Sequence, residues 1–224
     1  QEPRGVGHRF LARTQPSLEA QLCNLADEIA YNAHDIDDGV RSGLVTLEQL
    51  QEVPLFDQFR QQVLTEFAFL SDVAQGRRLL YESIRRMLST QVYDVISATE
   101  AAIAQENPTS VSDIRLAPPL VQFNAPMKQQ SQVLKAFLLS QLYRHPQVMD
   151  MTGQAQEVVR ELFAQYMAAP HEMGAGVLAR SEAGVSDSDS DASRARRVAD
   201  YIAGMTDRFA GREYERLTGQ AWLR

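Results

Sequence analysis

Apolar residues recur every three or four positions along most of the chain, a spacing typical of amphipathic α-helices. The pattern is clearest after Pro16, where four apolar residues follow at helical spacing: Leu18, Leu22, Leu25 and Ile29. Ser17 precedes them and is a residue type preferred at a helix N-cap. The sequence therefore predicts a helix that begins after Ser17 and ends at a glycine, either Gly39 or Gly43.

The same periodicity predicts further helices, separated by proline, glycine and polar breaks. Their expected ranges are 46–50, 55–70, 72–104 with an interruption near Gly76, 127–143, 148–167, and a last helix that begins after Ser193 and ends near Ala210. Residues 1–16 and 109–124 are expected to be irregular, because glycine or proline recurs in them. Hardly any segment alternates apolar and polar residues as strands do. The predicted fold class is all-α.

One internal segment departs from the helical pattern. Residues 181–194, SEAGVSDSDSDASR, are rich in Ser and Asp and poor in apolar residues, a composition typical of a mobile loop or linker. Such a loop is compatible with a boundary between two domains. The segment after it looks too short to form a core of its own, however, so a single all-α unit over residues 1–224 is expected.

Composition narrows the classes of protein to consider. The chain has 224 residues, of which 44% are hydrophobic and 23% are charged, as is ordinary for a globular protein. No apolar run is long enough to cross a bilayer, and the N-terminus lacks the residue order of a signal peptide. We therefore expect no membrane association and a cytoplasmic location. Cys23 is the single cysteine, which excludes a disulfide framework.

The net charge of −7 argues against a bulk electrostatic attraction to nucleic acid. A regulatory nucleic acid would depend on local basic patches such as Arg77-Arg78 and Arg85-Arg86, which are more typical of solvated helix surfaces. An anionic substrate such as a nucleotide would likewise need a local basic group or a metal ion.

Candidate chemistry concentrates in the first predicted helix. Asp27, Tyr31 and Asp35 are spaced four residues apart, and four residues turn a helix by about 400°, so their side chains form one gently drifting line. His34 falls near the same line. Carboxylate oxygens and imidazole nitrogens bind divalent cations, and a tyrosine beside hydrogen-bonding groups suits a sugar. Acidic residues on a helix most often face solvent, so the spacing alone leaves both interpretations open.

The string LADEIAYNAHDIDDG, residues 25–39, closely resembles the signature helix of the HD-domain deoxynucleoside triphosphate triphosphohydrolases, in particular their bacterial dGTP triphosphohydrolase-like members. Three further stretches resemble segments of the same family, in the same order: PRGVGHRF, LAPPLVQFNAPMKQQSQVLKAFLLSQLYRHPQV and ADYIAGMTDRFAGREYERL. The resemblance covers most of the chain except the acidic loop. It implies an HD-superfamily helical fold, with residues 1–43 at the end of the HD core and residues 44–224 in an HD-associated helical region.

The resemblance also assigns roles to residues. It implies that Asp27 is the last metal ligand of the family's set, that Tyr31 packs against the deoxyribose, and that Asp35 hydrogen-bonds the sugar 3′-hydroxyl. Lys135 aligns with a basic residue near the phosphates, although an exposed helix lysine is an equally good interpretation. Tyr143 aligns near a sugar-contacting tyrosine, and a core or interface aromatic is the alternative.

The remaining ligands of the family, a histidine and a His-Asp pair, lie before this helix in the relatives. No His-Asp pair precedes Asp27 here, and we interpret His34-Asp35 as a coincidental match. The chain therefore resembles the C-terminal part of such an enzyme. It is expected to hold no catalytic residue and to be inactive alone.

For the intact enzyme, the resemblance implies hydrolysis of a deoxynucleoside triphosphate to a deoxynucleoside and inorganic triphosphate. It also implies a divalent cation, Mg²⁺, Mn²⁺ or a similar ion, and a homo-oligomer. Two alternatives stay open. One is a non-catalytic helical module for assembly or regulation, in which residues 72–104 would pack against another subunit. The other is an HD phosphohydrolase that acts on a different phosphoester.

Overall fold

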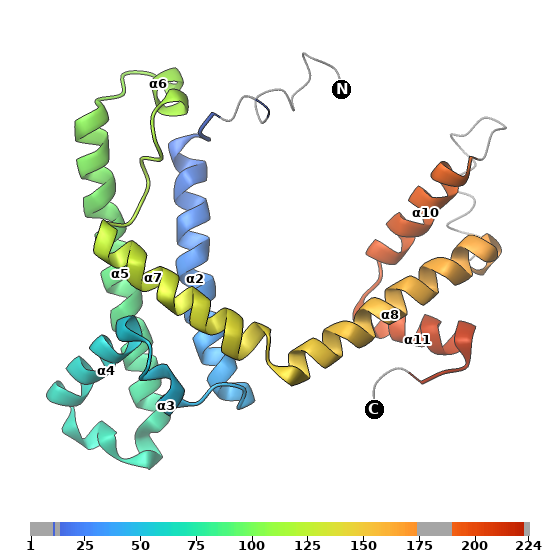
Figure 1. Ribbon diagram of the computed structural model, residues 1–224, viewed down its shortest axis with the longest axis horizontal. Helices are drawn as coiled ribbons and strands as arrows, with labels where there is room; N and C mark the ends of the chain where they lie inside the picture. Colours follow the sequence, from blue (N-terminus) through green and yellow to red (C-terminus); the bar gives the residue numbers. More distant parts are fainter. Residues whose placement is uncertain (1–10, 12–13, 174–189, 222–224) are drawn as a thin grey trace. The chain divides into compact units, whose positions relative to one another are not determined.

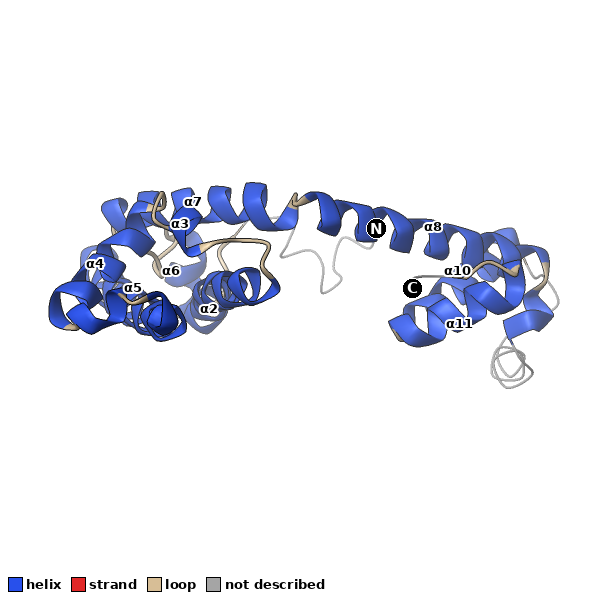
Figure 2. Cartoon of the chain, turned by 90° about the horizontal axis from the view of Figure 1, so that it is seen from below, coloured by secondary structure: helices blue, strands red, loops and turns tan. Residues whose placement is uncertain are grey.

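The computed structural model (Figure 1) describes residues 11, 14–173 and 190–221. Helices joined by turns and short loops make up this part of the chain, which contains no strand (Figure 2). The prediction of an all-α fold is therefore confirmed. Within this part, none of the helices is both long enough and apolar enough to cross a lipid bilayer.

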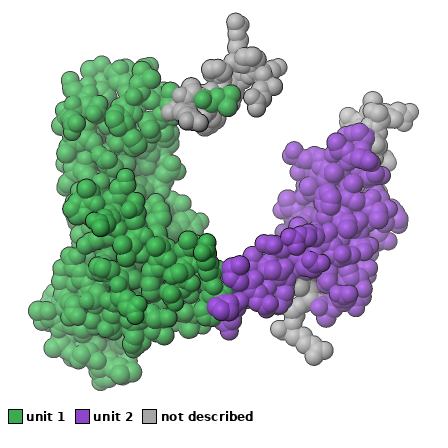
Figure 3. Space-filling view, viewed as in Figure 1, with its two compact units in different colours: residues 1–145 green, residues 146–224 purple. Residues whose placement is uncertain are grey.

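The chain divides into two compact units, residues 1–145 and residues 146–224 (Figure 3). Each unit has a buried apolar cluster of its own. The expectation of a single unit over residues 1–224 stays a prediction.

The first unit begins with α2 (Leu18–Ser42), whose two ends agree with the sequence-based prediction. The Ser17 hydroxyl accepts the backbone N–H of Ala20, which caps the first turn. Gly43 ends the helix in the left-handed region, at φ 75°, where a residue with a Cβ atom would be strained. The cap chemistry therefore fixes both ends of the helix that carries the candidate site.

Five more helices follow among the described residues of the first unit: α3 (Leu47–Leu50), α4 (Pro54–Glu66), α5 (Gly76–Glu106), α6 (Val111–Leu116) and α7 (Ala125–Leu138). Two 3₁₀ turns, η1 (Ala68–Ser71) and η2 (Val73–Gln75), connect α4 to α5, and a π-helical turn, η3 (Leu139–Tyr143), follows α7. The yellow helix α7 runs across the blue helix α2 in Figure 1, and it contacts both α2 and α4.

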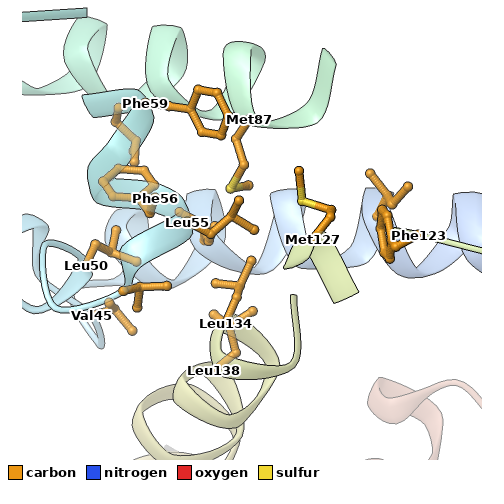
Figure 4. Close-up of a cluster of buried hydrophobic side chains, with 14 of the residues drawn as sticks. Val45, Leu50, Leu55, Phe56, Phe59, Met87, Phe123, Met127, Leu134 and Leu138 are labelled. Atoms are coloured by element: carbon orange, nitrogen blue, oxygen red, sulfur yellow. The ribbon is translucent and has the colours of Figure 1, made fainter. Parts of the chain in front are cut away.

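The core of this unit fills the space between α2, α4, α5 and α7 (Figure 4). Its labelled members come from α3, α4, α5 and α7 and from the residues that precede α3 and α7: Val45, Leu50, Leu55, Phe56, Phe59, Met87, Phe123, Met127, Leu134 and Leu138. Burial of such side chains stabilises the fold by about 1.5–3 kcal/mol each. The core therefore holds α7 against α2, and this crossing positions the candidate site.

Two predicted boundaries in this unit were wrong. The long α-helix begins at Gly76, and the residues directly before it form the 3₁₀ turn η2, so no α-helix is interrupted there. The segment 109–124 contains α6, because the Ser110 hydroxyl accepts the backbone N–H of Asp113 and caps a new helix. Asn107, at φ 44°, ends α5 directly before Pro108, close to the predicted end at residue 104.

Three helices and a 3₁₀ turn lie in the described part of the second unit, residues 146–173 and 190–221: α8 (Pro146–Ala168), η4 (Pro170–Met173), α10 (Asp191–Ala203) and α11 (Asp207–Thr218). Both α10 and α11 pack against α8. Their buried side chains make a small core: Val158, Leu162, Tyr166, Met173 and Val198. The helices α10 and α11 thus bury their apolar side chains against α8.

The last predicted helix is in fact two helices. Ser190, rather than Ser193, is the N-cap of α10, because its hydroxyl accepts the backbone N–H of Ser193 at 3.3 Å. Thr206 caps α11 in the same way, so a continuous helix as far as Ala210 was a wrong prediction. Residues 181–189 of the predicted acidic loop lie outside the described residues.

Candidate functional site

The line of candidate residues on α2 differs in exposure from one end to the other. Asp27 is exposed, Tyr31 has 60% of its surface exposed, and Asp35 is half-buried. The half-buried end lies toward η3, whose Tyr143 contacts Asp35. Any site on this line is therefore open at Asp27 and enclosed at Asp35.

A pocket of about 400 Å³ lies between α2 and α7. Residues of α2, α7 and η3 line it: Glu28, Tyr31, Asn32, Asp35, Lys135, Ala136, Leu138, Leu139 and Tyr143. Four of the five residues selected from the sequence are among them, although α2 and η3 are about a hundred residues apart in the chain. Asp27 does not line this pocket.

The Tyr143 hydroxyl donates a hydrogen bond of 2.5 Å to Oδ2 of Asp35. This bond holds the phenol in its neutral form, and it raises the pKa of Tyr143 to about 12, with a smaller contribution from burial. Tyr143 is at the end of the π-helical turn η3, where the sequence predicts a regular helix. Such turns shift the register of the residues that follow them and are frequent at functional sites.

Replacement of Asp35 by alanine is expected to lower the pKa of Tyr143 from about 12 toward the ordinary value of 10.0. An ultraviolet pH titration of phenolate absorbance measures this change. Because folding raises the pKa of this phenol, the hydrogen bond stabilises the fold fully below about pH 10, and the stabilisation is lost as pH rises through about 12. Asp38→Ala, an exposed carboxylate of the same helix, is the control. Identical titrations for the two variants would contradict the assignment.

Lys135 forms an ion pair with Glu28, with 3.0 Å between Nζ and Oε2. Both side chains are partly exposed, at 48% and 33%, and pairs of this kind contribute about 0–1 kcal/mol. Lys135 is therefore held at the pocket yet is free to exchange its partner for another anion. Sequence reasoning missed Glu28, since nothing in the spacing says which acidic residues of α2 face α7.

Asn32 is the second lining residue that sequence reasoning missed. Only 6% of its surface is exposed, and its Nδ2 has no hydrogen-bond partner among the described residues. An asparagine on the buried side of a helix ordinarily forms hydrogen bonds, so its unpaired state is unusual.

Comparison with known proteins finds a matching domain and several similar proteins. Residues 121–216 match a phosphohydrolase-associated domain. The chain is 46% identical over 212 residues to a deoxyguanosinetriphosphate triphosphohydrolase-like protein of Ralstonia nicotianae, across 95% of this chain and 51% of that protein. Proteins of the same name from Bordetella pertussis and Nitrosomonas europaea are 48% and 42% identical, across 95% of this chain and 52% and 53% of theirs.

The chain is related to the C-terminal part of the deoxyguanosinetriphosphate triphosphohydrolase-like proteins. The resemblance found in the sequence is thus confirmed. The chain spans about half the length of these relatives.

Asp27 fits a metal site only in part. Its carboxylate is exposed and forms no hydrogen bond or ion pair with the described residues, so it is available to a cation. Within residues 14–173 and 190–221, no group of three or more His, Cys, Asp and Glu side chains is arranged to hold a metal. Any further ligands would have to come from outside the described residues.

Arginines of α5 form hydrogen bonds and ion pairs with side chains of α5 and α4. Arg77 donates two hydrogen bonds to the hydroxyl of Tyr81, and Arg85 pairs with Glu82. Arg86 pairs with Glu82 as well and reaches Glu66 of α4 at 2.6 Å. These contacts favour the interpretation of the two arginine pairs as helix surface charges.

Proposed function

We propose that the full-length protein hydrolyses deoxynucleoside triphosphates, dGTP or a similar nucleotide, to a deoxynucleoside and inorganic triphosphate. In this proposal, the chain supplies the sugar-binding surface and one metal ligand. The observation that carries it is the convergence of Tyr31, Asp35, Lys135 and Tyr143 on one pocket. Release of inorganic triphosphate from dGTP by the full gene product is the test.

Tyr31 and Asp35 would bind the sugar. The exposed ring of Tyr31 offers a flat apolar surface, against which a deoxyribose packs and a 2′-hydroxyl would be crowded. Asp35 would accept a hydrogen bond from the 3′-hydroxyl. A carboxylate has about four lone-pair sites, so Asp35 can accept this bond and keep the one from Tyr143.

Lys135 would bind the phosphates. An ammonium group is a compact charge on a flexible stem, and its weak pair with Glu28 is exchangeable for a phosphate oxygen. The phosphate groups carry more charge than one carboxylate, which favours the exchange.

A divalent cation, Mg²⁺ or Mn²⁺, would bind to Asp27 together with ligands from outside this chain. When bound, such a cation polarises a phosphate oxygen and lowers the pKa of a water molecule. Asp27 itself would contribute an anionic oxygen at the exposed end of the line of Asp27, Tyr31 and Asp35 on α2.

Tyr31→Ala is expected to reduce the preference for dNTP over NTP, since removal of the ring relieves the crowding of a 2′-hydroxyl. A single steric contact of this size changes discrimination by about 10- to 200-fold. The ratio of kcat/KM for dGTP and GTP measures the effect. Tyr93→Ala, which removes an exposed tyrosine of α5, is the control. An unchanged ratio in the Tyr31 variant would contradict the role.

One observation favours the second candidate function, a helical assembly module. An apolar groove of about 350 Å³ runs between α2 and α5. Three of its lining side chains are 40–51% exposed: Leu22, Val92 and Ile96. Light scattering over a range of concentrations tests this candidate, because an assembly through the groove would give a mass that rises with concentration and falls in Ile96→Asp.

A further inference from the structure

The side-chain amide nitrogen of Asn32 is buried without a hydrogen-bond partner among the described residues. It lines the pocket between α2 and α7, 6% of its surface is exposed, and its Nδ2 meets no acceptor among the described residues. A buried N–H group that lacks a partner destabilises the fold, and such groups are rare. A partner that arrives with a ligand would account for this residue.

Four other polar side chains of the pocket already have partners, unlike the amide nitrogen of Asn32. Asp35 accepts from Tyr143, and Lys135 pairs with Glu28. Asn32 is thus the one lining donor that is both buried and uncommitted among the described residues. It comes directly after Tyr31 and three residues before Asp35, within one turn of the helix.

We propose that Asn32 is a further substrate-binding residue, whose side-chain amide donates a hydrogen bond to an oxygen atom of the deoxynucleoside sugar. The inference rests on the proposed function, because it takes the sugar site at Tyr31 and Asp35 as given. A sugar oxygen is favoured over a phosphate oxygen for two reasons. Asn32 is uncharged, and its neighbours on α2 are the two sugar-binding candidates, whereas the candidate phosphate group Lys135 is on α7.

The test compares two ligands, one that contains the sugar and base of the substrate and one that contains its phosphate groups. Binding of deoxyguanosine and of inorganic triphosphate to the full gene product is measured by titration calorimetry, for the wild type, Asn32→Leu and Asn32→Ala. Loss of one hydrogen bond to the sugar is expected to weaken deoxyguanosine binding by about 5- to 30-fold in both variants. Triphosphate binding is expected to stay unchanged. Asn24→Ala, an exposed asparagine of the same helix, is the control and is expected to bind both ligands normally.

Thermal unfolding of the ligand-free protein gives an independent readout. Leucine is close to asparagine in size and has no unpaired donor, so Asn32→Leu is expected to leave Tm unchanged or to raise it. A structural asparagine would behave in the opposite way, with a lower Tm and no selective effect on deoxyguanosine.

Three results would overturn the inference: deoxyguanosine affinity that both variants retain, an equal loss of affinity for deoxyguanosine and triphosphate, or failure of both variants to fold. In the first case wild-type binding persists and only the role of Asn32 is wrong. A wild-type protein that binds no deoxyguanosine would overturn the proposed function together with the inference.

Discussion

Replacement of Asp27 by alanine in the full-length protein is expected to abolish both metal binding and dNTP hydrolysis. The carboxylate is exposed and unpaired among the described residues, so no structural contact is lost with it. Loss of a residue that only supports a metal ligand typically costs 10- to 100-fold in affinity or activity, and loss of a ligand is expected to exceed about 100-fold. Calorimetric titration with Mn²⁺ and the rate of dGTP hydrolysis measure the two effects.

The control for this variant is Asp38→Ala, which removes an exposed carboxylate from the same helix. Its metal affinity and turnover are expected to equal those of the wild type. Full turnover and retained Mn²⁺ binding in Asp27→Ala would show that the candidate ligand is only a solvated helix charge.

Leu134→Ala is expected to destabilise the first unit by about 2–5 kcal/mol. Leu134 is fully buried on α7, in the core that holds this helix against its neighbours (Figure 4). Truncation removes apolar contacts and leaves a cavity, which a close-packed interior fills only in part. Urea unfolding followed by circular dichroism measures the loss. Because Lys135 is the next residue, weaker binding of inorganic triphosphate is expected to accompany it.

Val133→Ala is the matched control, since Val133 is the preceding residue of α7 and is 43% exposed. Its stability is expected to stay within about 0.5 kcal/mol of the wild type. Equal stabilities for Leu134→Ala and Val133→Ala would contradict the packing of α7 described above.

The helix ends show how far the sequence predicts the fold. Ser17 and Gly43 carry cap chemistry that is local, so the start of α2 could be predicted and its end could be narrowed to Gly39 or Gly43. Ser190 and Ser193 are equally good caps by residue type, so residue type alone does not predict that Ser190 caps α10. The π-helical turn at η3 leaves no signal in an otherwise helical pattern, and yet it positions Tyr143.

Some residues of the candidate site could likewise be predicted from the sequence, and others could not. The four-residue spacing predicts that Tyr31 and Asp35 share a face of α2, and the structure places both at one pocket. The involvement of Glu28 and Asn32 depends on which side of α2 is covered by α7, a contact between segments about a hundred residues apart. Periodicity within one helix contains no information on such a contact.

The most direct test of the proposed function is the identity of the phosphate product. The full gene product is incubated with dGTP and Mn²⁺, beside the 224-residue chain alone, and the products are separated by ion chromatography. The account predicts inorganic triphosphate and deoxyguanosine from the full gene product and no turnover by the chain alone. Orthophosphate or pyrophosphate as the first product would contradict it and would favour a phosphohydrolase that acts on another phosphoester.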